Sequence, residues 1–365
     1  MKKLIIFLCV LCVLFTTVFY GCGSEDVNNS SRIPVLQDDD AEDSMLLCGS
    51  GDNLVSYYEK TQQEYLDLCK EYENKGYKVF SSSEKNGNCF TTLVKDKERV
   101  HVYWIECEEE LNVIYSRKNG AGMPEKIEKT GDIPTTITPV PRADGSVGGY
   151  VIQLSDGSFI VYDGGSAADA NTLFSILSGL AGNDSFVISA WVLTVSNENR
   201  YGCFQQFSQT YTENITLKTV IAAPMSGPIA IPSRQTYLTN DLAADVEKFA
   251  DAKICYVHTG MTLTFCNVEL EVLFTGEEIY ICDAPTKDEF ENTALVSRIK
   301  TENKSAMFVS DCGIHSARRF AIYYGEYLKS DFCTAPQDGS SLFPVYVYNI
   351  IDADSYISDN AVSLD

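Results

Sequence analysis

Histidine is scarce in this chain of 365 residues, which contains only His101, His258 and His315. No two of them are close in sequence, so no histidine motif of the kind that binds catalytic zinc is present. Paired cysteines are lacking as well, because none of the ten cysteines after Cys22 belongs to a C-x-x-C pair. This excludes the signatures of zinc ribbons and of thioredoxin-like redox sites.

Basic side chains are also few, with 28 Lys and Arg against 51 Asp and Glu and a net charge of −23 at pH 7. Such an acidic surface repels phosphate backbones and anionic lipids, so nucleic acid is excluded as a partner. It is suited to cationic partners or loosely held Ca²⁺, although a solvated acidic surface is the simpler interpretation. Apolar residues make up 45% of the chain, which is enough for a folded core.

The N-terminus has the pattern of an export signal. Two lysines precede an apolar run over residues 4–20, which is short for a transmembrane helix. A glycine and Cys22 follow, and the whole resembles a bacterial lipoprotein signal. We expect lipidation of Cys22 and a membrane-anchored protein on the extracytoplasmic face of a bacterium. Phe19 and Tyr20 depart from the usual lipoprotein pattern, so an uncleaved signal anchor is the alternative.

Composition divides the rest of the chain into further segments. Residues 23–44 are acidic and rich in Ser and Asn, which predicts a disordered tether; a calcium site there is disfavoured because EF-hand spacing is absent. Residues 45–129 predict a small α+β domain, with a helix over 54–75 followed by antiparallel strands. The proline- and threonine-rich residues 130–148 predict an extended linker. The second domain is expected over 149–365.

The cysteines outside the signal are distributed singly. Ten remain besides Cys22 and the two in the apolar run, and several lie in strand-like apolar stretches, as Cys255 and Cys266 do. Cysteine in such places behaves as a small hydrophobic side chain. We expect mostly free, buried thiols, while an even number in an exported protein also permits one or two disulfides.

Four short segments of the second domain each combine a strand with a polar or glycine-rich corner. They are residues 149–165, 191–202, 308–312 and 329–339. In matching order they resemble motifs of the metallo-β-lactamase-fold superfamily, and the small domain resembles the N-terminal region of clostridial-type lipoprotein relatives. The resemblance implies an α/β fold, an αββα sandwich preceded by a small α+β domain. The 26 residues after Gly339 leave little room for the usual closing strand and helix, so a rebuilt or incomplete C-terminal layer is expected.

The metal-binding positions of the resembled family are altered in this chain. The family's main motif, Thr-His-x-His-x-Asp-His-x-Gly, matches Thr194–Gly202, which places Val195, Asn197, Asn199 and Arg200 at the ligand positions. Valine has no donor atom, neutral amides are weak zinc ligands and arginine is permanently charged. The resemblance therefore implies a catalytically inactive domain without a zinc cofactor.

A few other family positions match. Those with a structural role are Asp163, Gly164, Gly165 and Gly202. By the resemblance, Asp163 would orient the loop beneath the site, and Asp311 would be the one surviving metal ligand. Asp338 stands where the family has a histidine.

The former metal corner is expected to be polar. Asn197, Glu198, Asn199, Arg200, Asp311 and Asp338 would converge there, and an internal salt-bridge network is favoured over a pocket for a small cationic or zwitterionic ligand or a weakly bound Ca²⁺. A non-metal nucleophile is poorly supported, because Ser196 has no histidine base nearby in sequence and Cys203 and Cys312 are expected in packed positions.

These features together favour a membrane-anchored, extracytoplasmic pseudoenzyme that acts as a binding or scaffold module for an unknown extracellular ligand or protein. The alternative is a metal-dependent hydrolase of the phosphodiesterase, lactonase or β-lactamase type with a displaced or rebuilt metal site. The low histidine content favours the pseudoenzyme, and a metal analysis would discriminate between the two.

Overall fold

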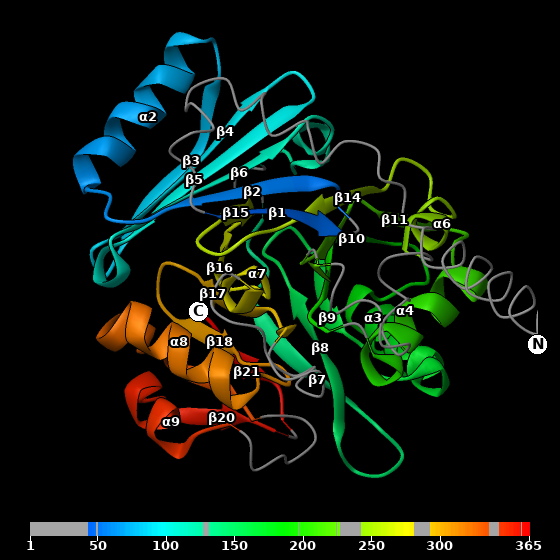
Figure 1. Cartoon of the computed structure of the whole chain (residues 1–365). Helices are drawn as coiled ribbons and strands as arrows, with labels where there is room; N and C mark the ends of the chain where they lie inside the picture. Colours follow the sequence, from blue (N-terminus) through cyan, green and yellow to red (C-terminus); the bar gives the residue numbers. More distant parts are fainter. Residues whose placement is uncertain are drawn as a thin grey trace, which may run out of the picture. The chain divides into compact units, whose positions relative to one another are not determined.

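A computed structural model describes most of the chain after the predicted tether (Figure 1). It covers residues 43–48, 50–126, 131–195, 197–223, 225–226, 242–280, 293–335, 343–358 and 360–365. All of these belong to one compact unit that spans Ala41–Asp365. The signal, Cys22 and nearly all of the tether lie outside the described residues. No helix within the described ranges is long and apolar enough to cross a membrane.

The first sheet of the sandwich combines a parallel half with an antiparallel half. Its order is β14-β12-β10-β9-β8-β7-β21, with β11 also paired to β10. The bounds are β7 Thr136–Pro141, β8 Val147–Gln153, β9 Phe159–Asp163, β10 Phe186–Leu193, β11 Ile215–Leu217, β12 Thr219–Ala222, β14 Lys253–Tyr256 and β21 Val362–Ser363. The nearly continuous apolar sequence of β10 fits its central position, since it pairs in parallel with both β9 and β12 and is covered on both faces.

The second sheet of the sandwich has the order β15-β16-β17-β18-β19-β20. Its bounds are β15 Thr262–Phe265, β16 Val268–Phe274, β17 Val296–Lys300, β18 Ser305–Phe308, β19 Phe332–Thr334 and β20 Ser355–Ile357. The first four strands pair antiparallel, and β19 and β20 are added in parallel.

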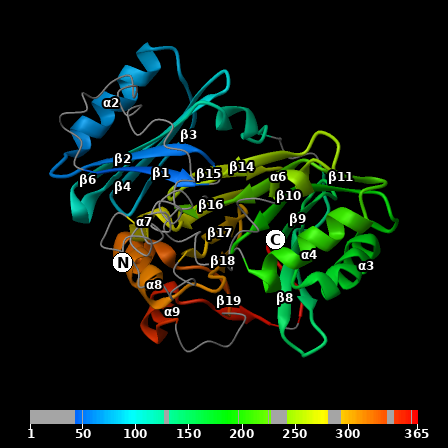
Figure 2. The same ribbon diagram turned by 45° about the vertical axis from the view of Figure 1, so that its right-hand side comes forward.

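Three hydrophobic clusters define the layers of the sandwich. One lies between the two sheets and joins Ile152 and Tyr162 to Leu270 and Phe308. A second covers the outer face of the first sheet, against α3 (Ala170–Ala181), α4 (Glu198–Thr210) and α6 (Leu242–Val246). The third covers the outer face of the second sheet, against α8 (Ile314–Tyr324) and α9 (Val345–Ile351). Figures 1 and 2 show these helix groups on opposite sides, so the predicted αββα sandwich is confirmed.

A third, antiparallel sheet packs at one end of the sandwich. Its order is β13-β1-β2-β6-β5-β4-β3. The bounds are β1 Asp43–Cys48, β2 Asp52–Tyr57, β3 Lys78–Lys85, β4 Asn88–Lys95, β5 Glu98–Ile105, β6 Glu110–Ser116 and β13 Met225–Ser226. Helix α2 (Gln62–Asn74) covers one face through Tyr65, Leu68, Cys69 and Tyr72. It begins at a capping box in which Thr61 and Glu64 bond each other's backbone N–H.

Two sequence predictions for this part of the chain are wrong. The helix predicted from residue 54 begins only at residue 62, because residues 52–57 form β2 between β1 and β6. The predicted linker over residues 130–148 contains β7, which pairs with β8 on one side and β21 on the other. Its prolines are compatible with a strand because only some backbone N–H groups of β7 are needed for pairing.

The C-terminal residues complete the second layer rather than leaving it open. Helix α9 packs in the cluster over the second sheet, and β20 extends that sheet. Strand β21 crosses to the first sheet and pairs with β7 through Val362 and Ile137. The expectation of an incomplete layer is therefore wrong.

Eight cysteines are free thiols: Cys69, Cys89, Cys107, Cys203, Cys255, Cys266, Cys312 and Cys333. Seven of these eight are buried and Cys107 is exposed. Burial raises the pKa of Cys69 and of Cys255 to about 11, so these thiols stay protonated and unreactive at neutral pH. Within the described residues this agrees with the predicted mostly free, buried cysteines.

Candidate functional site

The end of the β8–β9 hairpin is anchored by a buried carboxylate. Asp163 has a positive φ of 52° and accepts hydrogen bonds from the Thr194 backbone N–H at 2.8 Å and hydroxyl at 2.7 Å. Its backbone oxygen accepts from the Trp191 indole at 2.8 Å. Burial raises the pKa of Asp163 to about 6, against the opposing effects of the Arg200 charge and the Thr194 bonds. Asp163 therefore joins the ends of β9 and β10, as the resemblance implied.

Glycine is required at two points of this corner. Gly164 has a φ of 128°, and a Cβ there would lie 2.8 Å from the Cys203 sulfur. At Gly202 a Cβ would lie 3.0 Å from the Ala167 backbone nitrogen. These contacts bring the first turns of α4 close to the hairpin end, which fixes the position of the helix.

The loop from β10 to α4 directs its side chains in different directions. Val195 is buried and packs in the cluster over the second sheet. Asn197 is the N-cap residue of α4 without a side-chain capping bond, and its Oδ1 is buried without a hydrogen-bond partner. Asn199 is exposed and accepts only a long 3.5 Å bond from Arg142. The predicted convergence is therefore wrong for Glu198 and Asn199, which lie at the surface.

Arg200 and Asp311 meet as a buried ion pair. The Nε of Arg200 lies 2.9 Å from Oδ2 of Asp311, and Nη2 bonds Oδ1, which makes the pair bidentate. The side chains are 1% and 6% exposed. Arg200 lies in the first turn of α4, where the helix dipole disfavours a cation, so the carboxylate offsets both burial and dipole. The predicted salt bridge in the former metal corner is confirmed for this pair; Ser196 and Asp338 lie outside the described residues.

Ser310 links the two corners through a directed hydrogen-bond chain. It precedes Asp311 with a positive φ of 49°, a left-handed conformation that glycine adopts at lower cost than serine. Its hydroxyl is bonded to that of Thr194. Because the single hydroxyl hydrogen of Thr194 is donated to Asp163, Ser310 must be the donor to Thr194. Ser310, after β18, is therefore bonded to Thr194, after β10, and Thr194 is bonded in turn to Asp163 at the end of β9.

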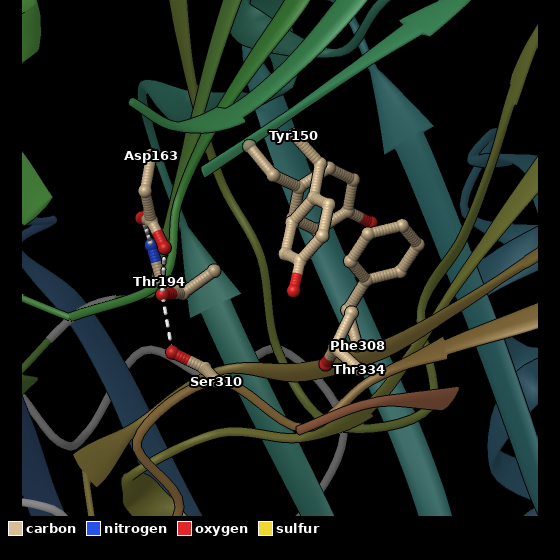
Figure 3. Close-up of a pocket in the computed structure, with 7 residues that line it drawn as sticks. Tyr150, Asp163, Thr194, Phe308, Ser310 and Thr334 are labelled. Carbon is tan, nitrogen blue, oxygen red and sulfur yellow. Dashed lines mark hydrogen bonds between the residues drawn. The ribbon is translucent and has the colours of Figure 1, made fainter. Parts of the chain in front are cut away.

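A small pocket opens beside this chain of bonds (Figure 3). Three aromatic and four polar residues line it: Tyr150, Tyr162, Phe308, Asp163, Thr194, Ser310 and Thr334. The rings of Tyr162 and Phe308 stack at 4.1 Å. The volume open to the centre of a water molecule is about 10 Å³, which is room for about one water.

The donor set of this corner does not fit zinc. No group of three or more His, Cys, Asp or Glu side chains in the described parts of the chain could hold a metal ion. Asp311, the one family ligand retained, is bonded through both oxygens to a guanidinium. A catalytic zinc needs about three protein ligands, and a fixed positive charge at this distance opposes any divalent cation.

The histidines form no metal-binding cluster within the described residues. His315 is exposed at the start of α8. His101 donates from Nε2 to the Thr259 backbone oxygen, and its Nδ1 accepts from the Thr92 hydroxyl. His258 belongs to a second polar network, which sequence patterns did not predict.

This second network joins the seven-stranded sheet to the sandwich. Asp52 accepts from Arg99 at 2.8 Å and lies 3.1 Å from His258. The other ring nitrogen of His258 lies 3.2 Å from Glu277. Burial opposes the charged form of His258, but the carboxylates of Glu277 and Asp52 outweigh it and raise the pKa of the histidine. The residues come from β2, β5, the loop after β14 and the short helix α7 (Glu277–Tyr280), so no local spacing could reveal them.

Comparisons with known proteins give only distant structural similarity. No family model and no curated protein matches the chain. A metallo-β-lactamase with the HARLDQ motif from Cronobacter sakazakii is 11% identical, with 58% of this chain and 78% of that chain covered and a TM-score of 0.34. CmlA, a diiron β-hydroxylase from Streptomyces venezuelae, is 12% identical, with 57% and 35% covered and a TM-score of 0.33. At TM-scores this low the assignment of a metallo-β-lactamase-like fold rests on the chain's own sheets, clusters and helices.

Proposed function

We propose that this chain is a membrane-anchored, extracytoplasmic pseudoenzyme with a metallo-β-lactamase-like fold, acting as a binding or scaffold module. The observation that carries the proposal is the buried ion pair of Arg200 and Asp311. A guanidinium here replaces a metal ion in charge and in its bond to Asp311. It provides no open coordination position and no activated water.

The energetics support a permanent replacement. A metal could reach Asp311 only by displacing Arg200, which would leave a guanidinium buried without its carboxylate. Breaking a buried pair in this way costs about 3–5 kcal/mol. The remaining positions of the motif are the core residue Val195, the surface residue Asn199 and Asn197, whose Oδ1 is buried without a hydrogen-bond partner. Neutral amides are weak metal ligands, so these positions would offset little of that cost.

The anchoring part of the proposal rests on the N-terminal sequence. Cys22 after a short apolar run would carry acyl chains, and a multiply acylated cysteine holds a protein stably at a membrane. The acidic tether would keep the folded unit away from anionic headgroups. A binding role for an extracellular ligand or protein then requires no chemistry at the former metal corner.

The decisive experiment is metal analysis combined with activity assays. The full chain would be purified without chelators, analysed for zinc, iron and manganese, and assayed against phosphodiester, lactone and β-lactam substrates before and after metal addition. The proposal expects well below one equivalent of metal and no turnover. About one equivalent or more together with turnover would replace it with the rival proposal, a hydrolase with a rebuilt metal site.

A further inference from the structure

Buried carboxyl groups meet where the seven-stranded sheet contacts the sandwich. Glu110 is the first residue of β6, and Glu277 and Glu278 are the first residues of α7. Their exposed fractions are 2%, 0% and 1%. Ionised carboxylates are rarely buried to this degree unless a cation or several hydrogen-bond donors compensate them.

Glu278 is bonded only by neutral groups. Its Oε1 accepts from the Tyr103 hydroxyl at 2.8 Å, and its Oε2 accepts from the Tyr323 hydroxyl at 3.2 Å. Tyr103 lies in β5 and Tyr323 in α8, so these bonds cross the junction. Glu110 is less well compensated, because its Oε1 is buried without a hydrogen-bond partner.

The nearby cations already have other carboxylates. The charged and titratable side chains around the pair are Tyr103, Glu108, His258, Glu277, Arg319 and Tyr323. Arg319 is bonded to Glu108 at 2.7 Å, and His258 lies 3.2 Å from Glu277. Among the described residues, no cation is hydrogen-bonded to Glu110 or Glu278.

Protonation is the remaining way to remove charge from the pair. Burial is the main cause that raises the pKa of Glu278 to about 7. Burial, and then the charge of Glu278, raise the pKa of Glu110 as well. Two carboxyls that interact in this way lose their protons in steps that belong to the pair.

We propose that Glu110 and Glu278 form a proton-dependent latch between the seven-stranded sheet and the sandwich. With at least one carboxyl protonated, the junction is closed. When both ionise above neutral pH, repulsion between two poorly solvated charges loosens the contact of β5 with α7, which the bond from Tyr103 to Glu278 makes. The latch does not depend on the function proposed for the Arg200 corner.

The latch also touches an element that reaches that corner. Helix α8 supplies Arg319 and Tyr323 to the junction and starts at Ile314, just after Asp311. A junction that opens therefore removes contacts from one side of the helix that follows the ion pair. Loss of a proton at the junction would therefore increase the mobility of α8.

Amide hydrogen exchange on the full chain tests this proposal. Protection factors for residues 110–116, 277–280 and 314–324 would be measured from pH 6 to pH 9, after correction for the intrinsic pH dependence of exchange. In the wild-type chain they should fall by up to about tenfold per pH unit for each proton lost. Glu110→Gln, which stays neutral, should keep its protection at high pH.

The matched control is Glu109→Gln, which removes the same charge from an exposed neighbour. It should show the wild-type pH dependence. Equal behaviour of the Glu110→Gln and Glu109→Gln variants, or constant protection in the wild type, would overturn the latch. If Glu110→Gln does not fold, the exchange experiment uses the Glu278→Gln variant in its place. Infrared difference spectra of the wild-type chain then test directly whether a buried carboxyl is protonated. Absence of a buried protonated carboxyl at pH 6 that titrates below pH 9 would equally overturn the proposal.

Discussion

The guanidinium of Arg200 and the carboxylate of Asp311 form a bidentate pair between α4 and the β18–α8 loop, with Nε 2.9 Å from Oδ2. The two residues are 111 positions apart in the chain. The pair thus joins the two halves of the sandwich, because α4 covers the first sheet and the β18–α8 loop follows a strand of the second.

Removal of Arg200 should destabilise the chain clearly. Arg200→Ala leaves the Asp311 carboxylate buried without its cation, and we expect a loss of about 3–5 kcal/mol in the free energy of unfolding. Arg200→Ala combined with Asp311→Asn should recover part of this loss. Urea denaturation measures both variants, with Lys60→Ala as the control because its pair with Glu64 is largely exposed and worth about 0–1 kcal/mol. A loss at Arg200 no larger than that at Lys60 would contradict the structural role of the pair.

The hydroxyl of Thr194 should matter independently of that pair. Thr194→Val keeps the shape but removes the donor to Asp163 and the acceptor for Ser310. Leaving buried polar groups unsatisfied costs about 1–3 kcal/mol, so the melting temperature should fall. Thr216→Val at an exposed strand position is the control and should change little. The hydrogen-bond chain would be of no consequence if the two variants melted at the same temperature.

Asp163 should produce a specific dependence of stability on pH. Its pKa is raised from an ordinary 3.8 to about 6 in the folded chain, so the folded state binds the proton more tightly than the unfolded state. The stability this gives is complete below about pH 4 and is lost as the pH rises through 6, with a slope of up to about 1.4 kcal/mol per pH unit. Asp163→Asn should flatten this part of the profile, whereas Asp184→Asn, at an exposed position, should not. Parallel profiles for all three proteins in calorimetry from pH 4 to pH 7 would refute this assignment.

Cys22 should determine membrane retention. Cys22→Ser removes the atom that would carry the acyl chains, so the protein should be released or remain as an unprocessed precursor. Cell fractionation and intact-mass measurement distinguish these outcomes, and Cys107→Ser, at the exposed cysteine, is the control. Unchanged retention at unchanged mass would instead favour an uncleaved signal anchor.

The sandwich was predictable from sequence because four strand-and-corner segments resemble motifs of one fold family in matching order. The Arg200–Asp311 pair was predictable for a different reason: one cation stands in a loop whose resembled family brings that position close to a retained aspartate. The pairing of β1 with β13 was not predictable, since the two strands lie nearly half the chain apart in sequence. The networks at the junction escaped prediction likewise, because Asp52, Arg99 and His258 become neighbours only after three sheets have assembled.

The two tryptophans of the chain lie in different parts of the folded unit. Trp191 is in the sandwich, with its indole N–H on the Asp163 backbone oxygen, and Trp104 is in the seven-stranded sheet, with its indole N–H on the Lys60 backbone oxygen. Each part therefore contains its own intrinsic fluorophore. When one tryptophan is replaced by phenylalanine, the emission of the other reports only on the unfolding of its own surroundings. Comparison of the two single-tryptophan variants then measures whether the seven-stranded sheet and the sandwich unfold together.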